Sequence, residues 1–288
     1  MLWGTTGTVA TFLPDAASPL AIGAATMGIG GVLLFATAPR LSSGVLRDPV
    51  TRRFAAIGAI GVVVYPLAFY WGMSLVGVAI GNVAALGSGP VFAGIIESLV
   101  ERRRPPGRWF VATAIAVLGI ALLAAGRDED GAVDATGGEA LLGVALGLLA
   151  GLAYALFTYA SSRAIQAGAP SRGAMGAMFG LGALPLLVVL LLLGAPLLES
   201  AESIALTGYL ALGPMLLAYI LFGIGLRSVR SSAATTITLL EPVFATALAV
   251  AVVGERLTPI GWAGFCLVIV GLGVLITARR SVAAGARS

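Results

Sequence analysis

The chain has 288 residues, of which 59% are hydrophobic and only 10% are charged, and its mean hydropathy is +1.03. This composition excludes an ordinary soluble domain and indicates a polytopic membrane protein that lies in a lipid bilayer. All 17 basic residues are arginine and histidine is absent, so a histidine-based metal site or proton relay is excluded. The arginines lie in short segments between apolar runs, which indicates membrane topology rather than a nucleic-acid partner.

The apolar runs predict ten transmembrane helices, all α-helical. Five lie at about 1–13, 19–38, 54–76, 78–100 and 109–126. After a polar link at 127–139, five more lie at about 140–161, 173–193, 204–226, 231–253 and 260–278. At about 1.5 Å per residue the first run spans only about 20 Å of a hydrocarbon core about 30 Å thick. We therefore expect either a truncated start or a first helix that needs support.

The arginines between the runs test this helix count. If the N-terminus is cytoplasmic, 15 of the 17 arginines fall in cytoplasmic segments, and only Arg127 and Arg256 fall outside. One missed span would invert every later segment, so this segregation favours ten spans with both termini in the cytoplasm. The arginine-, alanine- and glycine-rich composition is typical of a bacterial chain, which predicts the bacterial cytoplasmic membrane as its location.

The two halves of the chain repeat. The segment GSGPVFAGIIESLVERRRPPGRWF in the first half matches LLEPVFATALAVAVVGERLTPIGWAGF in the second. Pro90 and Pro242 are 152 positions apart, and so are Gly119 and Gly271. Five helices per copy is an odd number, so the copies must cross the membrane in opposite senses, as in the inverted repeats of secondary transporters. We predict two five-helix domains, 1–130 and 131–288.

The opening LWG, the PVF in each half and the block LLEPVF…VVGERLTPIGWAGFCLVIVGL closely resemble the EamA type of the drug/metabolite transporter superfamily. The resemblance covers nearly the whole chain and implies a carrier, mostly an exporter or uptake system, for small metabolites such as amino acids. This chain differs from the pattern in having Gly89 where the second copy has Glu241. When Gly4 is aligned with Gly151, the first helix is roughly eight residues shorter than the equivalent helix of the second copy. This difference raises the question of whether Met1 is the native start.

Glu241 is the leading candidate for substrate binding. It lies near the middle of an apolar run and directly before Pro242, whose ring and missing N–H predict a kink that frees the carbonyl of Thr238. A carboxylate in mid-membrane should find a partner or be protonated part of the time, which suits proton coupling or a cationic amine. Locking the kink is the alternative role. One helix stripe, which we expect to face a protein interior or a watery cavity, contains Ser231, Thr235, Thr238, Glu241 and Thr246.

Aromatic residues deep in the predicted spans indicate a central cavity for a small amphipathic metabolite. We expect this cavity to be apolar, with a few hydroxyl groups. Asn82 could hold a substrate carboxylate or amine, or could join two helices. The candidate substrate-binding residues are Trp3, Tyr65, Trp71, Asn82, Tyr154, Tyr219, Thr238 and Glu241, with Pro90 and Pro242 as kink or gating positions. For Glu97 we expect a local salt bridge with the arginines that follow it, or snorkelling at the membrane interface.

These features favour a secondary carrier that exports amino acids or related amphipathic compounds by alternating access. The alternative is a proton antiporter for drugs or cationic amines. A membrane enzyme is disfavoured because its chemistry normally needs a convergent set of acids or histidines, often with a metal. No ATP-binding loop motif and no ring of repeated charges appears, which argues against ATP energy and against a channel, and we expect neither a metal nor a cofactor. A scaffold without transport activity stays open.

Overall fold

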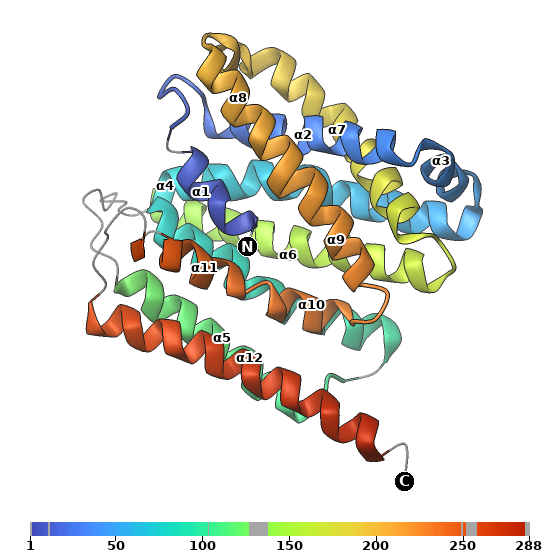
Figure 1. The fold of residues 1–288 in the computed structure, drawn as a ribbon, viewed down its shortest axis with the longest axis vertical. Helices are drawn as coiled ribbons and strands as arrows, with labels where there is room; N and C mark the ends of the chain where they lie inside the picture. Colours follow the sequence, from blue (N-terminus) through green and yellow to red (C-terminus); the bar gives the residue numbers. More distant parts are fainter. Residues whose placement is uncertain are drawn as a thin grey trace.

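The computed structural model is an all-helical bundle that describes residues 2–10, 12–102, 104–126, 138–248, 250–251 and 258–285 (Figure 1). No strand occurs in these ranges. Most of the polar link predicted at 127–139 lies outside the described residues, as do Arg103, Glu255 and Arg256. The helices run roughly alongside one another, with α5 and α12 at one end of the bundle and α2, α7 and α8 at the other.

The first part of the chain contains a 3-10 turn η1 (Trp3–Thr5) followed by α1 (Thr6–Ala10), α2 (Pro19–Thr37), α3 (Pro39–Arg47), α4 (Pro49–Glu101) and α5 (Gly107–Ala125). The second part contains α6 (Gly138–Gln166), α7 (Ser171–Leu193), the 3-10 turn η2 (Ala195–Leu198), α8 (Ala201–Leu210), the π-helical segment η3 (Ala211–Leu217), α9 (Ala218–Gly225), α10 (Ser231–Ile237), α11 (Leu240–Leu248) and α12 (Pro259–Gly285).

Seven helical segments within the described residues are long and apolar enough to cross a membrane. They are α2, the two parts of α4 at Pro49–Gly77 and Ile80–Glu101, α5, α6, α7 and the continuous run Ala201–Gly225. The other three predicted spans correspond to the short η1 and α1, to the broken pair α10 and α11, and to α12, whose described apolar part is Pro259–Leu275. The prediction of an all-α polytopic membrane protein is confirmed, whereas the count of ten spans stays a prediction.

Local sequence explains where several helices begin. Proline occupies the first helical position of α2, α3 and α4, where the missing N–H would have no intrahelical partner. The side chain of Ser18 accepts a hydrogen bond from the N–H of Ala21 at 3.2 Å. Asp48 caps α4 by accepting from the N–H and the hydroxyl of Thr51, at 2.9 and 2.7 Å, and these bonds lower the pKa of its carboxyl.

Gly77 divides the long helix α4 into two membrane-spanning parts. Its backbone angles, φ 80° and ψ 161°, belong to a region that residues with a Cβ rarely adopt. The chain therefore reverses within a few residues, and the two parts of α4 correspond to the predicted spans at 54–76 and 78–100.

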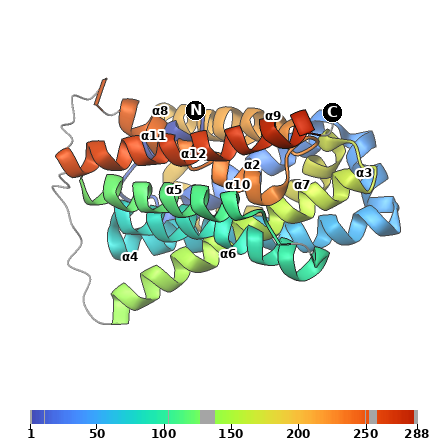
Figure 2. The same ribbon diagram turned by 90° about the horizontal axis from the view of Figure 1, so that it is seen from below.

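Glycines bring two pairs of helices into close antiparallel contact. In the first pair, Gly28 of α2 lies beside Leu186 of α7, and a Cβ on Gly31 would lie 2.5 Å from the carbonyl oxygen of Phe179. In the second pair, Gly119 of α5 lies beside Gly264 of α12, and Gly271 lies beside Ala112 (Figure 2). Small residues permit this approach, which suits helices that pack in lipid.

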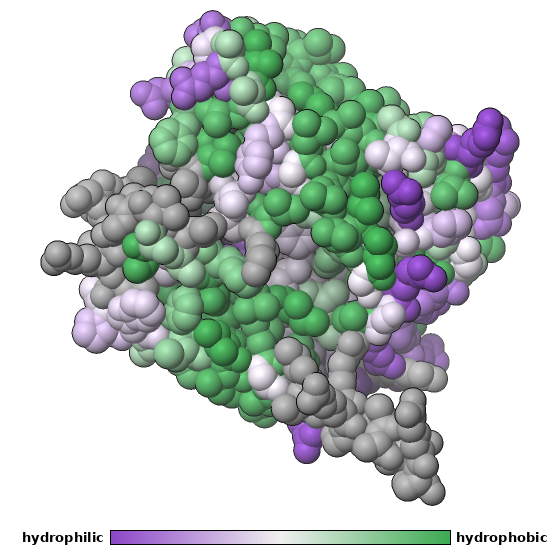
Figure 3. All heavy atoms as spheres, viewed as in Figure 1, coloured by the Kyte–Doolittle hydropathy of each residue, from purple (hydrophilic) through white to green (hydrophobic). Residues whose placement is uncertain are grey.

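Much of the visible outer surface of the bundle is apolar (Figure 3). Figure 3 shows hydrophobic residues over the middle of the visible face and hydrophilic ones mainly near the ends of the helices. On α7, for example, the side chains of Leu184 and Leu192 are 64% and 77% exposed. Exposed apolar surface of this kind is what a bilayer would cover.

Candidate functional site

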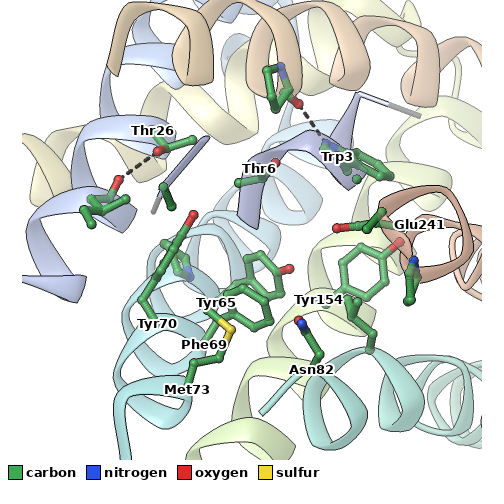
Figure 4. A pocket seen from close by; sticks show the side chains of 18 of the residues that line it. Trp3, Thr6, Thr26, Tyr65, Phe69, Tyr70, Met73, Asn82, Tyr154 and Glu241 are labelled. Atoms are coloured by element: carbon green, nitrogen blue, oxygen red, sulfur yellow. Dashed lines mark hydrogen bonds between the residues drawn. The ribbon is translucent and has the colours of Figure 1, made fainter. Parts of the chain in front are cut away.

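A cavity of about 610 Å³ lies between helices of both halves of the chain. Its walls come from η1 and α1, the first turns of α2, both parts of α4, the end of α5, Tyr154 of α6, η3, α9 and α11. Apolar and aromatic side chains form most of these walls, and a few polar groups project into the space (Figure 4). This volume and lining are typical of a site for one small molecule.

A break between α10 and α11 places Glu241 at the cavity. The regular helix ends at Ile237 and resumes at Leu240, because Pro242 has no N–H to donate to the carbonyl of Thr238. That carbonyl accepts instead from the N–H of Glu241 at 2.8 Å, a tighter turn that keeps the backbone satisfied. Glu241 thus lies in the first turn of α11, where the helix dipole favours a negative charge.

Two hydrogen bonds fix the orientation of the aromatic walls. The indole N–H of Trp3 donates to the carbonyl of Pro214 in η3 at 2.7 Å. The hydroxyl of Tyr154 lies 2.7 Å from that of Thr238, at the break beside Glu241. Since both polar atoms already have partners inside the protein, these residues offer mainly their ring faces to the cavity.

The aromatic residues also pack against one another. The ring centroids of Trp3 and Tyr219 are 5.0 Å apart, and those of Tyr65 and Tyr154 are 5.8 Å apart. Behind them Phe157 is fully buried, with its centroid 5.8 Å from that of Tyr65. Such packing holds the rings in place before any ligand binds.

The structure brings most of the predicted site residues together. The lining includes Trp3, Tyr65, Asn82, Tyr154, Tyr219, Glu241 and Pro242. Thr238 lies behind the wall and contacts it through Tyr154. Pro90 is buried inside the second part of α4 and lies outside the lining.

Trp71 does not line the cavity, since its side chain is 46% exposed on the surface of α4. It follows Tyr65 by six residues, which is about 240° around a helix and so points away from the face of Tyr65. Phe69 and Met73, at four and eight residues after Tyr65, do line the cavity. This helical spacing was the signal that could have found these two residues. Tyr70, five residues after Tyr65, also lines the cavity, although this spacing does not indicate it.

Other lining residues lacked a clear sequence signal. Thr26 and Met27 come from the early part of α2, where the sequence is apolar and glycine-rich with no periodic marker. Thr6 lies in α1, and Met215 lies in the π-helical segment η3. Only the folded arrangement brings these positions to one space.

The surroundings of Glu97 differ from those that the sequence predicted. Its side chain is only 3% exposed, and its carboxylate binds the start of α10. Its Oε1 accepts from the hydroxyl of Ser231 at 2.6 Å and the N–H of Ser232 at 2.9 Å, while its Oε2 accepts from the hydroxyl of Ser232 at 2.8 Å. Snorkelling at the membrane interface is therefore wrong, because the side chain is buried and the unpaired donors of a helix start satisfy the carboxylate. The expected salt bridge concerns in part Arg103, which lies outside the described residues.

Further hydrogen bonds join α5 to the same part of α10. The indole N–H of Trp109 donates to the carbonyl of Ser232 at 3.2 Å, and the hydroxyls of Thr113 and Thr236 lie 3.2 Å apart. The predicted polar stripe of the ninth span is thus largely turned into the protein, with Ser231, Thr235 and Thr246 all buried. Among the described residues, no three histidine, cysteine or acidic side chains gather as metal ligands would.

The fold and the cavity define the class as a helical, multi-pass membrane protein with an internal binding space. A family model described as the EamA-like transporter family matches residues 1–125 and 141–277. The chain belongs to this family, and it is a membrane transporter. The two matched segments agree with the repeat seen in the sequence.

The chain is also 33% identical over 282 residues to a Bacillus subtilis (strain 168) protein named as the uncharacterized transporter YwfM, with 96% of this chain and 91% of that protein covered. Its fold resembles that in a protein crystal structure with a TM-score of 0.78. That likeness covers 97% of this chain and 94% of the other at 18% identity, and it concerns the fold alone.

Proposed function

We propose that this protein is a secondary carrier that exports small amphipathic metabolites, such as amino acids or related compounds, by alternating access. The observation that supports this most directly is the cavity of about 610 Å³, with its aromatic walls and single carboxylate among the described lining residues. The proposed setting is the bacterial cytoplasmic membrane, with ten spans and both termini in the cytoplasm.

An inverted repeat would supply the two halves that move. The antiparallel packing of α2 with α7 and of α5 with α12 supports this, because the two helices of each pair take the same place in their respective halves. Gly4 and Gly151, aligned in the sequence, also make corresponding contacts. A Cβ on Gly4 would lie 3.2 Å from the carbonyl oxygen of Glu241, and one on Gly151 would lie 3.3 Å from the N of Gly89, the position that matches Glu241.

The contacts of Glu97 would close the cytoplasmic side. Cavity residues such as Ser74 and Ala124 lie near the ends of spans that the arginine pattern places outside the cell. Glu97 and Ser231 lie near the ends of spans that the same pattern places in the cytoplasm. Glu97 belongs to the first half and Ser231 to the second. In the proposed cycle, the three hydrogen bonds that Glu97 accepts from Ser231 and Ser232 break when the cavity opens to the cytoplasm.

Proton coupling is part of the proposal. Glu241 is a carboxylate within the cavity, and a carboxylate can bind and release a proton. If substrate and proton bind in turn at this group, the proton gradient can drive the substrate.

The test begins with the detergent-purified protein, whose thermal unfolding is measured with amino acids, amines, nucleosides and sugar phosphates. A ligand that binds only the folded state raises the unfolding temperature. Flux of the ligand that stabilises most is then measured in proteoliposomes. We expect Tyr219→Ala to reduce this flux at least tenfold, because it removes a buried wall of the cavity.

Trp71→Ala is the matched control, since it also removes a large aromatic ring, but one on the exposed surface of α4. Its flux should stay within about twofold of the parent. Equal losses in both variants, with both inserted normally, would contradict the cavity as the transport site. Absence of flux for every stabilising ligand would contradict the carrier itself.

A further inference from the structure

The charge of the cavity distinguishes between classes of substrate. Among the described lining residues, Glu241 is the one acidic side chain, and arginine, lysine and histidine are absent. The other polar groups are the amide of Asn82 and the hydroxyls of serine, threonine and tyrosine. A substrate anion would bring a second negative charge into mostly apolar walls, where like charges repel strongly.

The carboxylate lies among aromatic faces. Figure 4 shows the Glu241 side chain reaching into the space beside Trp3 and Tyr154, with Tyr65 and Asn82 on the other side of that space. The bonds of the Trp3 indole and of the Tyr154 hydroxyl hold these rings in place. An ammonium group is attracted both by a carboxylate and by an aromatic face within about 6 Å of the ring centroid.

We infer that the cavity selects substrates by a cationic amine, held between the Glu241 carboxylate and the faces of Trp3, Tyr65 and Tyr154. This inference rests on the proposed carrier function and names its substrate class. The apolar part of the substrate would contact residues such as Met73, Ile120 and Leu123, which also line the cavity. An ammonium neutralises the carboxylate, so the occupied cavity has no net charge from this pair.

A zwitterionic amino acid should bind less tightly than the amine of the same shape. Its ammonium would pair with Glu241, but its own carboxylate would have only uncharged donors to bind among the described lining residues. The amide of Asn82 is one such donor, and the hydroxyl of Thr6 is another. Uncharged donors offset the desolvation of a carboxylate less well than an arginine does.

The experiment uses four ligands with one phenyl group and different heads: phenethylamine, phenethyl alcohol, phenylalanine and 3-phenylpropionate. Binding to the purified full-length protein is measured by calorimetry at a pH where the amine is charged. We expect the amine to bind at least tenfold more tightly than the alcohol, phenylalanine to lie between them, and the propionate to bind most weakly. In Glu241→Gln the ratio of amine to alcohol affinity should fall below threefold.

Glu101→Gln is the matched control, since it removes one carboxylate that lies outside the cavity lining and pairs with Arg163 at 3.7 Å. Its amine-to-alcohol ratio should equal that of the parent. Glu241→Asp, which keeps the charge, should restore most of the preference and shows that the Glu241→Gln result is not a folding defect.

The inference is overturned if the amine does not bind, if the propionate binds as tightly as the amine, or if the preference survives in Glu241→Gln. Each of these results leaves the carrier function standing as long as some stabilising ligand shows Tyr219-dependent flux in proteoliposomes. Loss of the carrier function is recognised separately, by the absence of flux for every ligand that binds.

Discussion

Single glycines decide how closely the helices around the cavity approach. Gly151 of α6 lies against α4, where an added Cβ would overlap the hydroxyl of Ser88 and lie 2.6 Å from the carbonyl oxygen of Ala85. The next turn of α6 positions Tyr154 in the cavity wall. A shift of α6 away from α4 would therefore move Tyr154 and its bond to Thr238 as well.

Gly151→Ala should lower the stability of the protein by about 1–3 kcal/mol, because backbone atoms must move to admit the methyl group. The control is Gly208→Ala in α8, where an added Cβ meets nothing within 4 Å. This control should be neutral or should stabilise by up to about 1 kcal/mol, since alanine favours a helix over glycine. Thermal unfolding in detergent measures both, and equal effects would contradict the close approach of α6 and α4.

At the scale of elements, the buried carboxylate of Glu97 holds α10 against α4. The three donors it binds are all at the start of α10, and Trp109 of α5 binds the same residue, Ser232. One side chain of the first half therefore satisfies a helix start of the second half. The connection depends on charge as well as on hydrogen bonding, because a helix N-terminus attracts an anion.

Glu97→Ala should lower stability by about 3 kcal/mol, because it leaves buried donors of Ser231 and Ser232 without their acceptor. Glu97→Gln should cost less, since an amide oxygen can still accept one of these bonds. Glu101→Ala serves as the control. It removes a partly exposed pair at 3.7 Å, so its effect should stay within about 1 kcal/mol. A loss for Glu97→Ala no larger than for Glu101→Ala would contradict the structural role of Glu97.

Features of the helices could be predicted from the sequence wherever a single residue type determines the local backbone or is rare in its surroundings. Pro242 has no N–H, so the break before α11 and the loss of the regular helical partner of the Thr238 carbonyl followed from its position alone. Glu241 was recognisable because a carboxylate is rare in an apolar run. The partner of Glu97 could not be predicted in this way, since Ser231 is 134 residues further along the chain and local arginines offered a simpler partner.

Helix faces were the weaker part of the prediction. Trp71 was grouped with Tyr65 because both are aromatic and lie in one span, although the 3.6-residue period separates them. The division of the ninth span into α10 and α11 also alters which side each residue faces. Thr238 therefore binds the wall residue Tyr154 instead of lining the cavity itself.

At the scale of the whole molecule, the cavity lies between two halves whose contacts include α4 with α6, α2 with α7 and α5 with α12. If the halves rock around this space, the group that binds substrate must also respond to the driving gradient. Glu241 is the one acidic side chain among the described lining residues. The tyrosines that face the same cavity, Tyr65, Tyr70, Tyr154 and Tyr219, belong to a residue type that ordinarily titrates near pH 10.

The pH dependence of amine binding tests this role of Glu241. A proton and an ammonium group compete for one carboxylate, so the affinity for phenethylamine should rise as the pH rises and Glu241 loses its proton. Where Glu241 is mostly protonated, the rise approaches about tenfold per pH unit, and it levels off once the carboxylate is fully charged.

Glu241→Gln cannot exchange a proton at this position, and its affinity for phenethylamine should be flat between pH 6 and pH 8, within about twofold. Calorimetry in several buffers checks both, because the released proton adds the ionisation enthalpy of the buffer. A pH slope that persists in Glu241→Gln would assign the proton to another group, whereas a flat parent protein with normal flux would separate transport from protons altogether.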